Sequence, residues 1–391
     1  MHRITLLLIL FLLLPELYIY RMHIVRSCRS RVWRYLYLLP TLLLMTGYVA
    51  LMYGSGANAL AHHARYIGWL AIALLACTLP KVLFTLCSLA GWGVHALCPR
   101  CPRRPFIGVG LGIATLCFVC LLYGSLIGVS RFEVKEVEYH SPSLPPAFDG
   151  YRIVQLSDIH IGSWQGNEEA IRRLVERVNA QGADLILFTG DLVNQRSREL
   201  DGFQPILSQL RATDGVYSVL GNHDYGSYYR WDSEQEVEEN LTYLKEQQRQ
   251  MGWQLLNNEH VWLHQAGDSI ALIGVENDGE PPFPQYARLS EAMEGTEGHF
   301  QLLMSHNPTH WRREVLPQSD IELMLAGHTH AMQAILWGHS LAELLYPEWH
   351  GLYQEGERAL YVNIGIGYIG LPFRWGAWPE ITVITLRRAG M

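Results

Sequence analysis

Four long apolar stretches in the first 130 residues constrain this chain more than any other feature. They cover residues 4–20, 35–53, 66–90 and 106–130, and each holds 17 to 25 residues. A helix needs about 20 apolar residues to cross a membrane. The sequence therefore predicts an N-terminal bundle of about four transmembrane helices. Lys81, in the third stretch, is expected to face the bundle interior or to snorkel to the membrane surface.

The loops between these stretches predict an orientation. A cleaved signal peptide is the alternative for the first stretch, but an arginine-rich loop follows it and no Ala-x-Ala-like site does. The loops after the first and third stretches hold eight arginines, against two for the N-terminus and the loop after the second. Because positive loops stay in the cytoplasm, we expect a multi-pass inner-membrane protein with residues 131–391 outside the cytoplasm. If one span is miscounted, residues 131–391 would lie in the cytoplasm instead.

Charge divides the chain at the same place. Residues 1–130 carry a net charge of +10 and residues 131–391 a net charge of −17. So acidic a domain is a poor binder of nucleic acid, and 49% hydrophobic residues exclude intrinsic disorder. All seven cysteines lie in the first 120 residues, so the later part has no thiolate metal site. Cys98 and Cys101 resemble half of a metal knuckle, but without a second pair we interpret them as part of a loop.

The region after residue 130 alternates strands and helices. Residues 131–150 are predicted to be an extended linker, because their prolines cannot continue a helix. Short apolar runs then indicate strands buried on both faces, at 152–156, 184–188, 216–220, 270–273, 301–304, 321–325, 359–362 and 381–386. Helices are predicted after Asn167 and from Ser233, where Glu236 completes a capping box. Residues 151–391 therefore form an α/β domain.

Side chains that can bind metal follow five of these strands. The five tips are Asp158-Ile-His160, Gly190-Asp191, Gly221-Asn222-His223-Asp224, Ser305-His306-Asn307 and Gly327-His328-Thr329-His330. Oxygen and imidazole ligands without thiolate suit divalent Mn, Fe, Zn or Co. Each tip alone is common in ordinary turns, but in α/β domains ligands gather at the carboxyl ends of strands. A purely structural role would leave many polar side chains buried without partners, which is costly.

These five motifs, in this order, resemble those of the calcineurin-like metallophosphoesterases, and the resemblance covers residues 151–386. The closing stretch, with Leu371-Pro-Phe-Arg374 and Pro379-Glu380, is similar to a membrane-associated bacterial branch. That branch includes relatives of enzymes that cleave the diphosphate of UDP-diacylglucosamine. The resemblance implies a fold of two mixed β-sheets in a sandwich, flanked by helices.

The resemblance also implies the ligands of two divalent metal ions, expected to be Mn, Zn or Fe. One ion would be held by Asp158, His160, Asp191 and His330, and the other by Asp191, Asn222, His306 and His328. His223 matches the histidine that faces the leaving group and Asp224 lies beside it, so both are candidate catalytic residues. A hydroxide activated by the two ions would attack phosphorus in line.

The predicted function is metal-dependent hydrolysis of phosphoester or diphosphate bonds on a lipid-linked or envelope substrate. Membrane lipids are the expected partners and nucleic acid is not. Residues 334–349 are unusually aromatic, and they either pack on the core or form a lip toward an acyl chain or the membrane. A membrane-anchored metal-binding sensor without turnover is the alternative, which the non-ligand His223 disfavours. A transporter is disfavoured because Lys81 is interpreted as the single charge within the spans.

Overall fold

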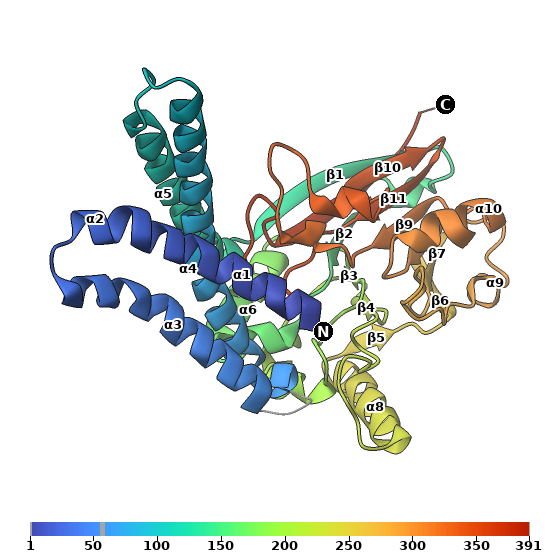
Figure 1. Ribbon diagram of the computed structural model, residues 1–391. Helices are drawn as coiled ribbons and strands as arrows, with labels where there is room; N and C mark the ends of the chain where they lie inside the picture. The colour runs from blue at the N-terminus through green and yellow to red at the C-terminus, as the bar shows by residue number, and fades with distance from the viewer. Residues whose placement is uncertain (1, 55–58, 391) are drawn as a thin grey trace. The chain divides into compact units, whose positions relative to one another are not determined.

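The computed structural model describes residues 2–54 and 59–390, with side chains described for residues 11–51 and 63–390. Figure 1 shows the chain. It divides into two compact units, Met1–Ile127 with Gly370–Phe373, and Gly128–Ile369 with Arg374–Met391. We describe each unit by itself and call them the helical unit and the sheet unit.

The helical unit contains the apolar helices α1 (His2–Ile19), α3 (Arg31–Gly54), α4 (Ala59–Leu97) and α5 (Arg104–Leu126). A π-helical turn (Tyr20–Ile24) and the short α2 (Val25–Ser27) lie between α1 and α3. Among the described residues, three stretches are long and apolar enough to cross a membrane: Arg31–Leu51, His63–Leu97 and Arg104–Ser130. They match the last three predicted spans. The first predicted span, 4–20, coincides with α1, but the side chains of its residues 4–10 lie outside the described ones.

Lys81 is paired inside the helical unit. Its Nζ lies 2.6 Å from Oε2 of Glu16, and both groups bond the hydroxyl of Thr41 at 3.0 Å. Glu16 lies on α1, within the first predicted span, so the interpretation of Lys81 as the single charge of the spans is wrong. A buried charge needs an opposite charge and hydrogen bonds to be tolerated. Glu16 and Thr41 supply these for Lys81, and together the three residues join α1, α3 and α4.

The sheet unit contains two six-stranded sheets. In chain order the strands are β1 (Glu133–Ser141), β2 (Arg152–Leu156), β3 (Leu185–Phe188), β4 (Val216–Ser218), β5 (Trp253–Leu255), β6 (Glu259–Gln265), β7 (Asp268–Gly274), β8 (Gln301–Met304), β9 (Leu323–Ala326), β10 (Gly351–Glu355), β11 (Arg358–Val362) and β12 (Glu380–Arg388). The first sheet has the order β1-β12-β2-β3-β4-β5, and only β12 and β2 pair antiparallel. The second has the order β10-β11-β9-β8-β7-β6, with antiparallel pairs at its two edges.

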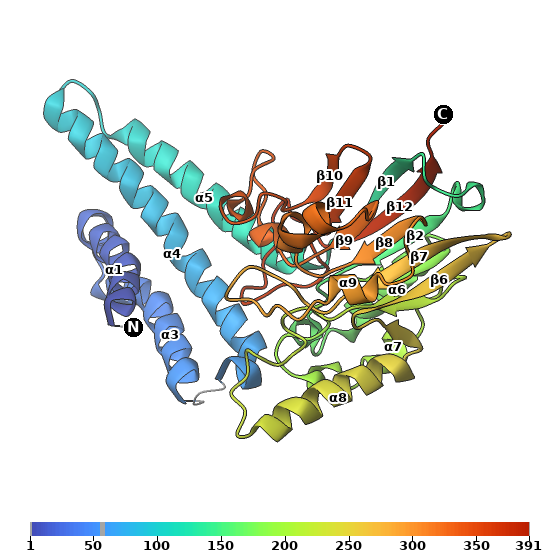
Figure 2. The ribbon, with the colours of Figure 1, turned by 90° about the vertical axis from the view of Figure 1, so that its right-hand side faces the viewer.

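The two sheets pack face to face. Leu185 and Leu187 of the first sheet and Leu272 and Leu302 of the second belong to one buried apolar cluster between them. A second cluster joins the outer face of the first sheet to α6 (Glu168–Asn179), α7 (Gln204–Leu207) and α8 (Glu234–Gln250). A third joins the outer face of the second sheet to α9 (Leu289–Ala292) and the helical turn around Trp311. This layering, visible in Figure 2, confirms the predicted two-sheet sandwich flanked by helices.

All eight predicted strands are present, as β2, β3, β4, β7, β8, β9, β11 and β12. The helices predicted after Asn167 and from Ser233 are α6 and α8. The Ser233 hydroxyl caps α8 by accepting the N–H of Glu236 at 3.3 Å. The carboxylate of Glu236 accepts the N–H of Asp232 instead of that of Ser233, so the predicted capping box is half formed.

The predicted linker is corrected by the structure, because residues 133–141 form β1. This strand pairs with β12 along its whole length, from Glu133 opposite Glu380 to Ser141 opposite Arg388. Along its second half, alternate side chains from Val137 are at least partly buried and those between them are exposed, which is the period-two pattern of an edge strand. The prolines that suggested a tether begin at Pro142, directly after the strand ends. The connection from the last apolar helix to the first sheet is therefore short.

Candidate metal centre

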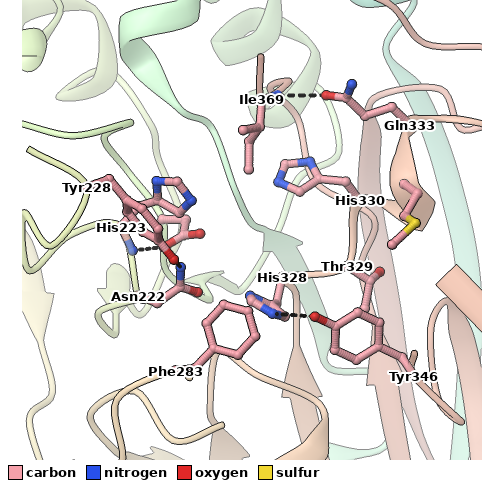
Figure 3. Close-up of a pocket in the computed structure, with 12 residues that line it drawn as sticks. Asn222, His223, Tyr228, Phe283, His328, Thr329, His330, Gln333, Tyr346 and Ile369 are labelled. Atoms are coloured by element: carbon pink, nitrogen blue, oxygen red, sulfur yellow. Dashed lines mark hydrogen bonds between the residues drawn. The ribbon is translucent and has the colours of Figure 1, made fainter. Parts of the chain in front are cut away.

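The five predicted motifs converge at one place, and three of them line a pocket there. They follow β2, β3 and β4, which are parallel neighbours in the first sheet, and β8 and β9, which are parallel neighbours in the second. Parallel strands end on the same side of a sheet, so their tips converge. The pocket has a volume of about 320 Å³ and is shown in Figure 3. Its lining consists of Asp191, Asn222, His223, Tyr228, Phe283, His328, Thr329, His330, Met332, Gln333, Tyr346 and Ile369.

Asp158, His160 and His330 form one group of convergent ligand atoms, and all three are buried. Nε2 of His330 lies 3.2 Å from Oδ1 of Asp158, and Nε2 of His160 lies 3.8 Å from the same oxygen. The two imidazole nitrogens are 3.1 Å apart. Three of the residues predicted to hold the first ion thus lie close enough together to share a cation.

Asp191, His306 and His328 form a second group. Nε2 of His306 lies 3.2 Å from Oδ2 of Asp191 and 3.3 Å from Nδ1 of His328. The same Asp191 oxygen lies 3.7 Å from Nε2 of His160, in the first group. Asp191 therefore lies between the two groups, at the position predicted for a ligand shared by two ions.

Asn222 completes the predicted ligand set on the pocket wall. Its Nδ2 donates to Oη of Tyr228 at 2.8 Å, as Figure 3 shows. Its Oδ1, like Oδ1 of Asp158, is buried and has no hydrogen-bond partner among the described residues. Buried polar atoms nearly always have a partner. Two unpartnered oxygens at predicted ligand positions fit the coordination of a cation.

Hydrogen bonds on the far side of the rings fix which histidine nitrogen faces the site. Nδ1 of His160 donates to the carbonyl of Val193 at 3.1 Å, and Nδ1 of His306 donates to the carbonyl of Thr189 at 2.7 Å. Nε2 of His328 bonds Oη of Tyr346 at 3.0 Å. A neutral imidazole that donates from one nitrogen presents a lone pair on the other. Nε2 of His160 and Nε2 of His306 therefore present lone pairs to the site, as metal ligands do, so these residues fit divalent metal ions.

The protonation states of the pocket histidines also bear on metal binding. Burial lowers the pKa of His160, His330 and His328, the last to about 3, so these rings are neutral and able to bind metal. Burial also opposes the charged form of His306, but the Asp191 carboxylate outweighs it and raises the pKa of His306 to about 9. The pocket thus favours positive charge beside Asp191.

Five of the predicted ligands have a strained backbone. The φ angles of Asp158, His160, Asp191, His328 and His330 lie between 46° and 75°. This left-handed region costs a residue other than glycine roughly 1–2 kcal/mol. Such strain concentrates at functional sites, where the surrounding fold holds it in place. Here the strained residues are themselves predicted ligands.

His223 lies on the pocket wall beside the two ligand groups. Its ring stacks on Tyr228 at a centroid distance of 4.1 Å, and its Nδ1 donates to the carbonyl of Asn194 at 2.5 Å. Its backbone N–H donates to Oδ1 of Asp191 at 2.8 Å. With Nδ1 occupied, Nε2 is the nitrogen available for proton transfer.

Asp224, the other candidate catalytic residue, is fully buried and bonds the backbone. Its two carboxylate oxygens accept the backbone N–H groups of Gly221, Asp191, Leu192 and Val193 at 2.9–3.2 Å. These bonds tie the third tip to the backbone of residues 191–193. They suit a residue that positions Asp191, and the catalytic role of Asp224 stays a prediction.

Sequence reasoning missed three side chains that hold the ligands. Tyr346 and Tyr228 bond His328 and Asn222, but they lie in loops without a recognisable spacing from those ligands. Arg374 belongs to the closing motif, yet no role was predicted for it. Its buried guanidinium donates to the carbonyls of Ile364, Gly367 and Ala377 and lies 3.0 Å from Nδ1 of His330. The signal available in the sequence was the arginine itself, which stands among apolar residues in the closing motif.

Comparisons with known proteins agree with this geometry. The family model described as "Calcineurin-like phosphoesterase" matches residues 151–332. The model described as "Probable Calcineurin-like phosphoesterase, transmembrane domain" matches residues 2–129. The two matches fall on the sheet unit and the helical unit respectively.

Individual relatives come from vertebrates and bacteria. The chain is 33% identical over 281 residues to "Transmembrane protein with metallophosphoesterase domain" of Danio rerio, which covers 69% of this chain and 61% of that protein. The Bos taurus protein of the same description is 34% identical and is also covered over 61% of its length. The chain thus spans less than two thirds of these two relatives. "Uncharacterized metallophosphoesterase YkuE" of Bacillus subtilis is 30% identical, over 73% of this chain and 97% of that protein.

Proposed function

This chain belongs to the membrane-associated calcineurin-like phosphoesterases, and on that premise we propose that it hydrolyses phosphoester or diphosphate bonds with two divalent metal ions. The observation that carries the proposal is the pair of histidine contacts, 3.1 Å between His160 and His330 and 3.3 Å between His306 and His328. Each pair presents nitrogen to nitrogen next to a carboxylate, an arrangement that only a cation or a proton stabilises.

We assign one ion to Asp158, His160, Asp191 and His330, and the other to Asp191, Asn222, His306 and His328. When bound, two such ions polarise phosphoryl oxygens and lower the pKa of a water to near neutrality. Manganese, zinc and iron all suit these ligands. Asp224 holds Asp191 in place through its backbone, and Tyr228 holds the Asn222 amide so that its oxygen points into the pocket.

The chain's own proton donor is His223. Its Nδ1 is fixed by the Asn194 carbonyl and its ring by the Tyr228 stack, so Nε2 can deliver a proton to the departing oxygen. A positioned general acid contributes roughly 10²–10⁴-fold to the rate. Because the proton donor His223 stands beside the full set of proposed ligands, an enzyme is favoured over a metal-binding sensor without turnover.

The pocket walls support a substrate with an apolar part. Tyr228, Phe283, Met332, Tyr346 and Ile369 surround the ligands, and none of these side chains carries charge. We propose a lipid-linked or envelope phosphate as the substrate. We also propose that this pocket lies outside the cytoplasm, at the inner membrane, because the eight arginines of two loops favour a cytoplasmic position for those loops.

The test uses the full-length chain in lipid nanodiscs, freed of metal and then supplied with Mn²⁺ or Zn²⁺. We expect metal-dependent release of an aryl alcohol from an aryl phosphodiester or phosphomonoester, and its loss in Asp158→Asn. A lipid phosphoester and its short-chain, water-soluble analogue are compared at equal concentration. Fully metal-loaded protein that turns over none of these compounds would reject the enzyme in favour of a metal-binding sensor.

A further inference from the structure

Six large apolar side chains lie exposed in the segment that follows His330, and we call them the apolar rim. They are Met332, Leu336, Trp337, Leu341, Leu344 and Leu345, with exposed fractions between 41% and 95%. The rim occupies the segment between the ligand His330 and Tyr346, the hydrogen-bond partner of His328. Met332 and Tyr346 also line the pocket. Large exposed apolar patches mark interaction sites, and this short segment concentrates such side chains.

The rim is held in place by its polar and small residues. Residues Leu341–Leu344 form a 3₁₀ turn whose cap, Ser340, accepts the N–H of Ala342 at 3.1 Å and donates to the carbonyl of Ala331 at 2.6 Å. Ala331 and Ala342 are fully buried in one apolar cluster. Because residues three apart eclipse in a 3₁₀ turn, Leu341 and Leu344 share the face opposite Ala342. Their exposure is therefore a fixed feature of the fold.

Trp337 lies at the tip of the rim. Leu336 and His339 form a β-bridge, and the two residues between them, Trp337 and Gly338, have φ angles of 52° and 84°. This tight turn leaves Trp337 95% exposed. Tryptophan, like tyrosine, is enriched where a protein meets the boundary between lipid headgroups and acyl chains.

The charges of this region favour an apolar occupant over an anionic one. Residues 332–346 contain one acid, Glu343, and no lysine or arginine. Residues 131–391 as a whole carry a net charge of −17. Attraction to anionic headgroups needs basic residues, so the rim has to gain its binding energy from apolar burial.

The length of the connecting chain selects the bilayer as the occupant. The last apolar stretch ends at Ser130 and β1 begins at Glu133, which leaves two residues between them. Two residues span at most about 7 Å. The start of β1 is thus tethered close to the end of the last apolar stretch, and acyl chains are the apolar phase that surrounds such a stretch in a membrane.

We propose that the apolar rim inserts into the headgroup–acyl boundary of the membrane that the chain spans, with Trp337 and Leu344 as its anchors. Because Met332 belongs to both the rim and the pocket lining, the pocket would then adjoin the lipid surface. A lipid phosphoester could enter it without leaving the bilayer. That last consequence rests on the proposed function, whereas the insertion itself does not.

The test measures the depth of the rim in lipid. The seven native cysteines are replaced by serine, and single cysteines are introduced as Trp337→Cys, Leu344→Cys and, on the exposed β6–β7 turn, the control Ala266→Cys. Each full-length variant carries an environment-sensitive fluorophore and is placed in phosphatidylcholine nanodiscs. Its quenching by nitroxide-labelled lipid is compared with its quenching by aqueous iodide, and metal content checks that each variant is folded.

We expect the labels at 337 and 344 to be quenched by the nitroxide lipid and protected from iodide, and the label at 266 to behave in the opposite way. Replacing part of the lipid with phosphatidylglycerol should not increase the lipid quenching. Protection from iodide without lipid quenching would mean that protein covers the rim, and would overturn the proposal. Lipid quenching that requires anionic lipid, or iodide quenching equal to that at 266, would overturn it as well. None of these readouts depends on catalysis, so the outcome is independent of the proposed hydrolysis.

Discussion

Nε2 of His306 and Nδ1 of His328 face each other at 3.3 Å, and the other nitrogen of each ring is already hydrogen-bonded. His160 and His330 repeat the arrangement at 3.1 Å in the neighbouring group. The two pairs lie on either side of the Asp191 carboxylate, which is the arrangement we propose for binding two cations.

Asp191→Asn should lose both ions, because the amide removes the negative charge that lies within 3.7 Å of both histidine groups. Elemental analysis of the purified variant measures this directly. Asp201→Asn, which changes an exposed carboxylate, should keep the wild-type metal content. Two ions at full occupancy in Asp191→Asn would contradict a shared carboxylate.

His223→Ala should keep its metal content while turnover falls by roughly 10²–10⁴-fold, because the variant loses a general acid and no ligand. The loss should be largest for substrates with poor leaving groups, which need protonation most. A series of aryl phosphoesters with graded leaving-group pKa measures the slope, with the exposed His264→Ala as control. An equal loss across the series would leave His223 only a charge-stabilising role.

Tyr346→Phe should weaken the ion held by His328 and leave the other ion bound. The phenol is the hydrogen-bond partner of His328 Nε2 at 3.0 Å, and removal of such an outer partner lowers metal affinity by about 10–100-fold. Competition with a chelator gives the two affinities separately. Tyr243→Phe, which removes an exposed hydroxyl bonded to Asp201, is the matched control. If the affinities for both metal ions are unchanged, Tyr346 contributes to the pocket wall but does not support His328 as a ligand.

Lys81→Met should destabilise the helical unit by about 3–5 kcal/mol, because it leaves the buried Glu16 carboxylate without its partner. The double variant Glu16→Gln with Lys81→Met should recover most of that loss, since both charges are then gone. Thermal unfolding in detergent micelles gives the comparison. A double variant as unstable as Lys81→Met would mean that packing, and not the ion pair, dominates at this position.

The orientation is tested by reporters fused after residue 391. A reporter active only outside the cytoplasm should work and a cytoplasmic one should fail, because the arginine-rich loops stay inside. The opposite pattern would place the pocket in the cytoplasm. A UDP-linked lipid precursor would then become the preferred substrate, because nucleotides are abundant on that side.

Much of this molecule follows from local sequence alone. Continuous apolar runs specify strands such as β2 and β8, because strands buried on both faces exclude polar residues from every position. The five ligand motifs were found for a related reason, since each follows directly after such a run. Long apolar stretches specify membrane helices because a bilayer offers no partner for backbone polar groups.

What depends on distant partners was decided only by the tertiary structure. The pairing of Lys81 with Glu16 joins residues 65 positions apart, and β1 becomes a strand because β12, from the other end of the sheet unit, lies beside it. The bonds of Tyr346 to His328 and of Asp224 to the backbone around Asp191 likewise join separate loops. Sequence periodicity reports which side of an element is buried, but not which element covers it. The kinds of functional residue could therefore be predicted from short stretches of sequence, whereas their arrangement in space required the folded structure.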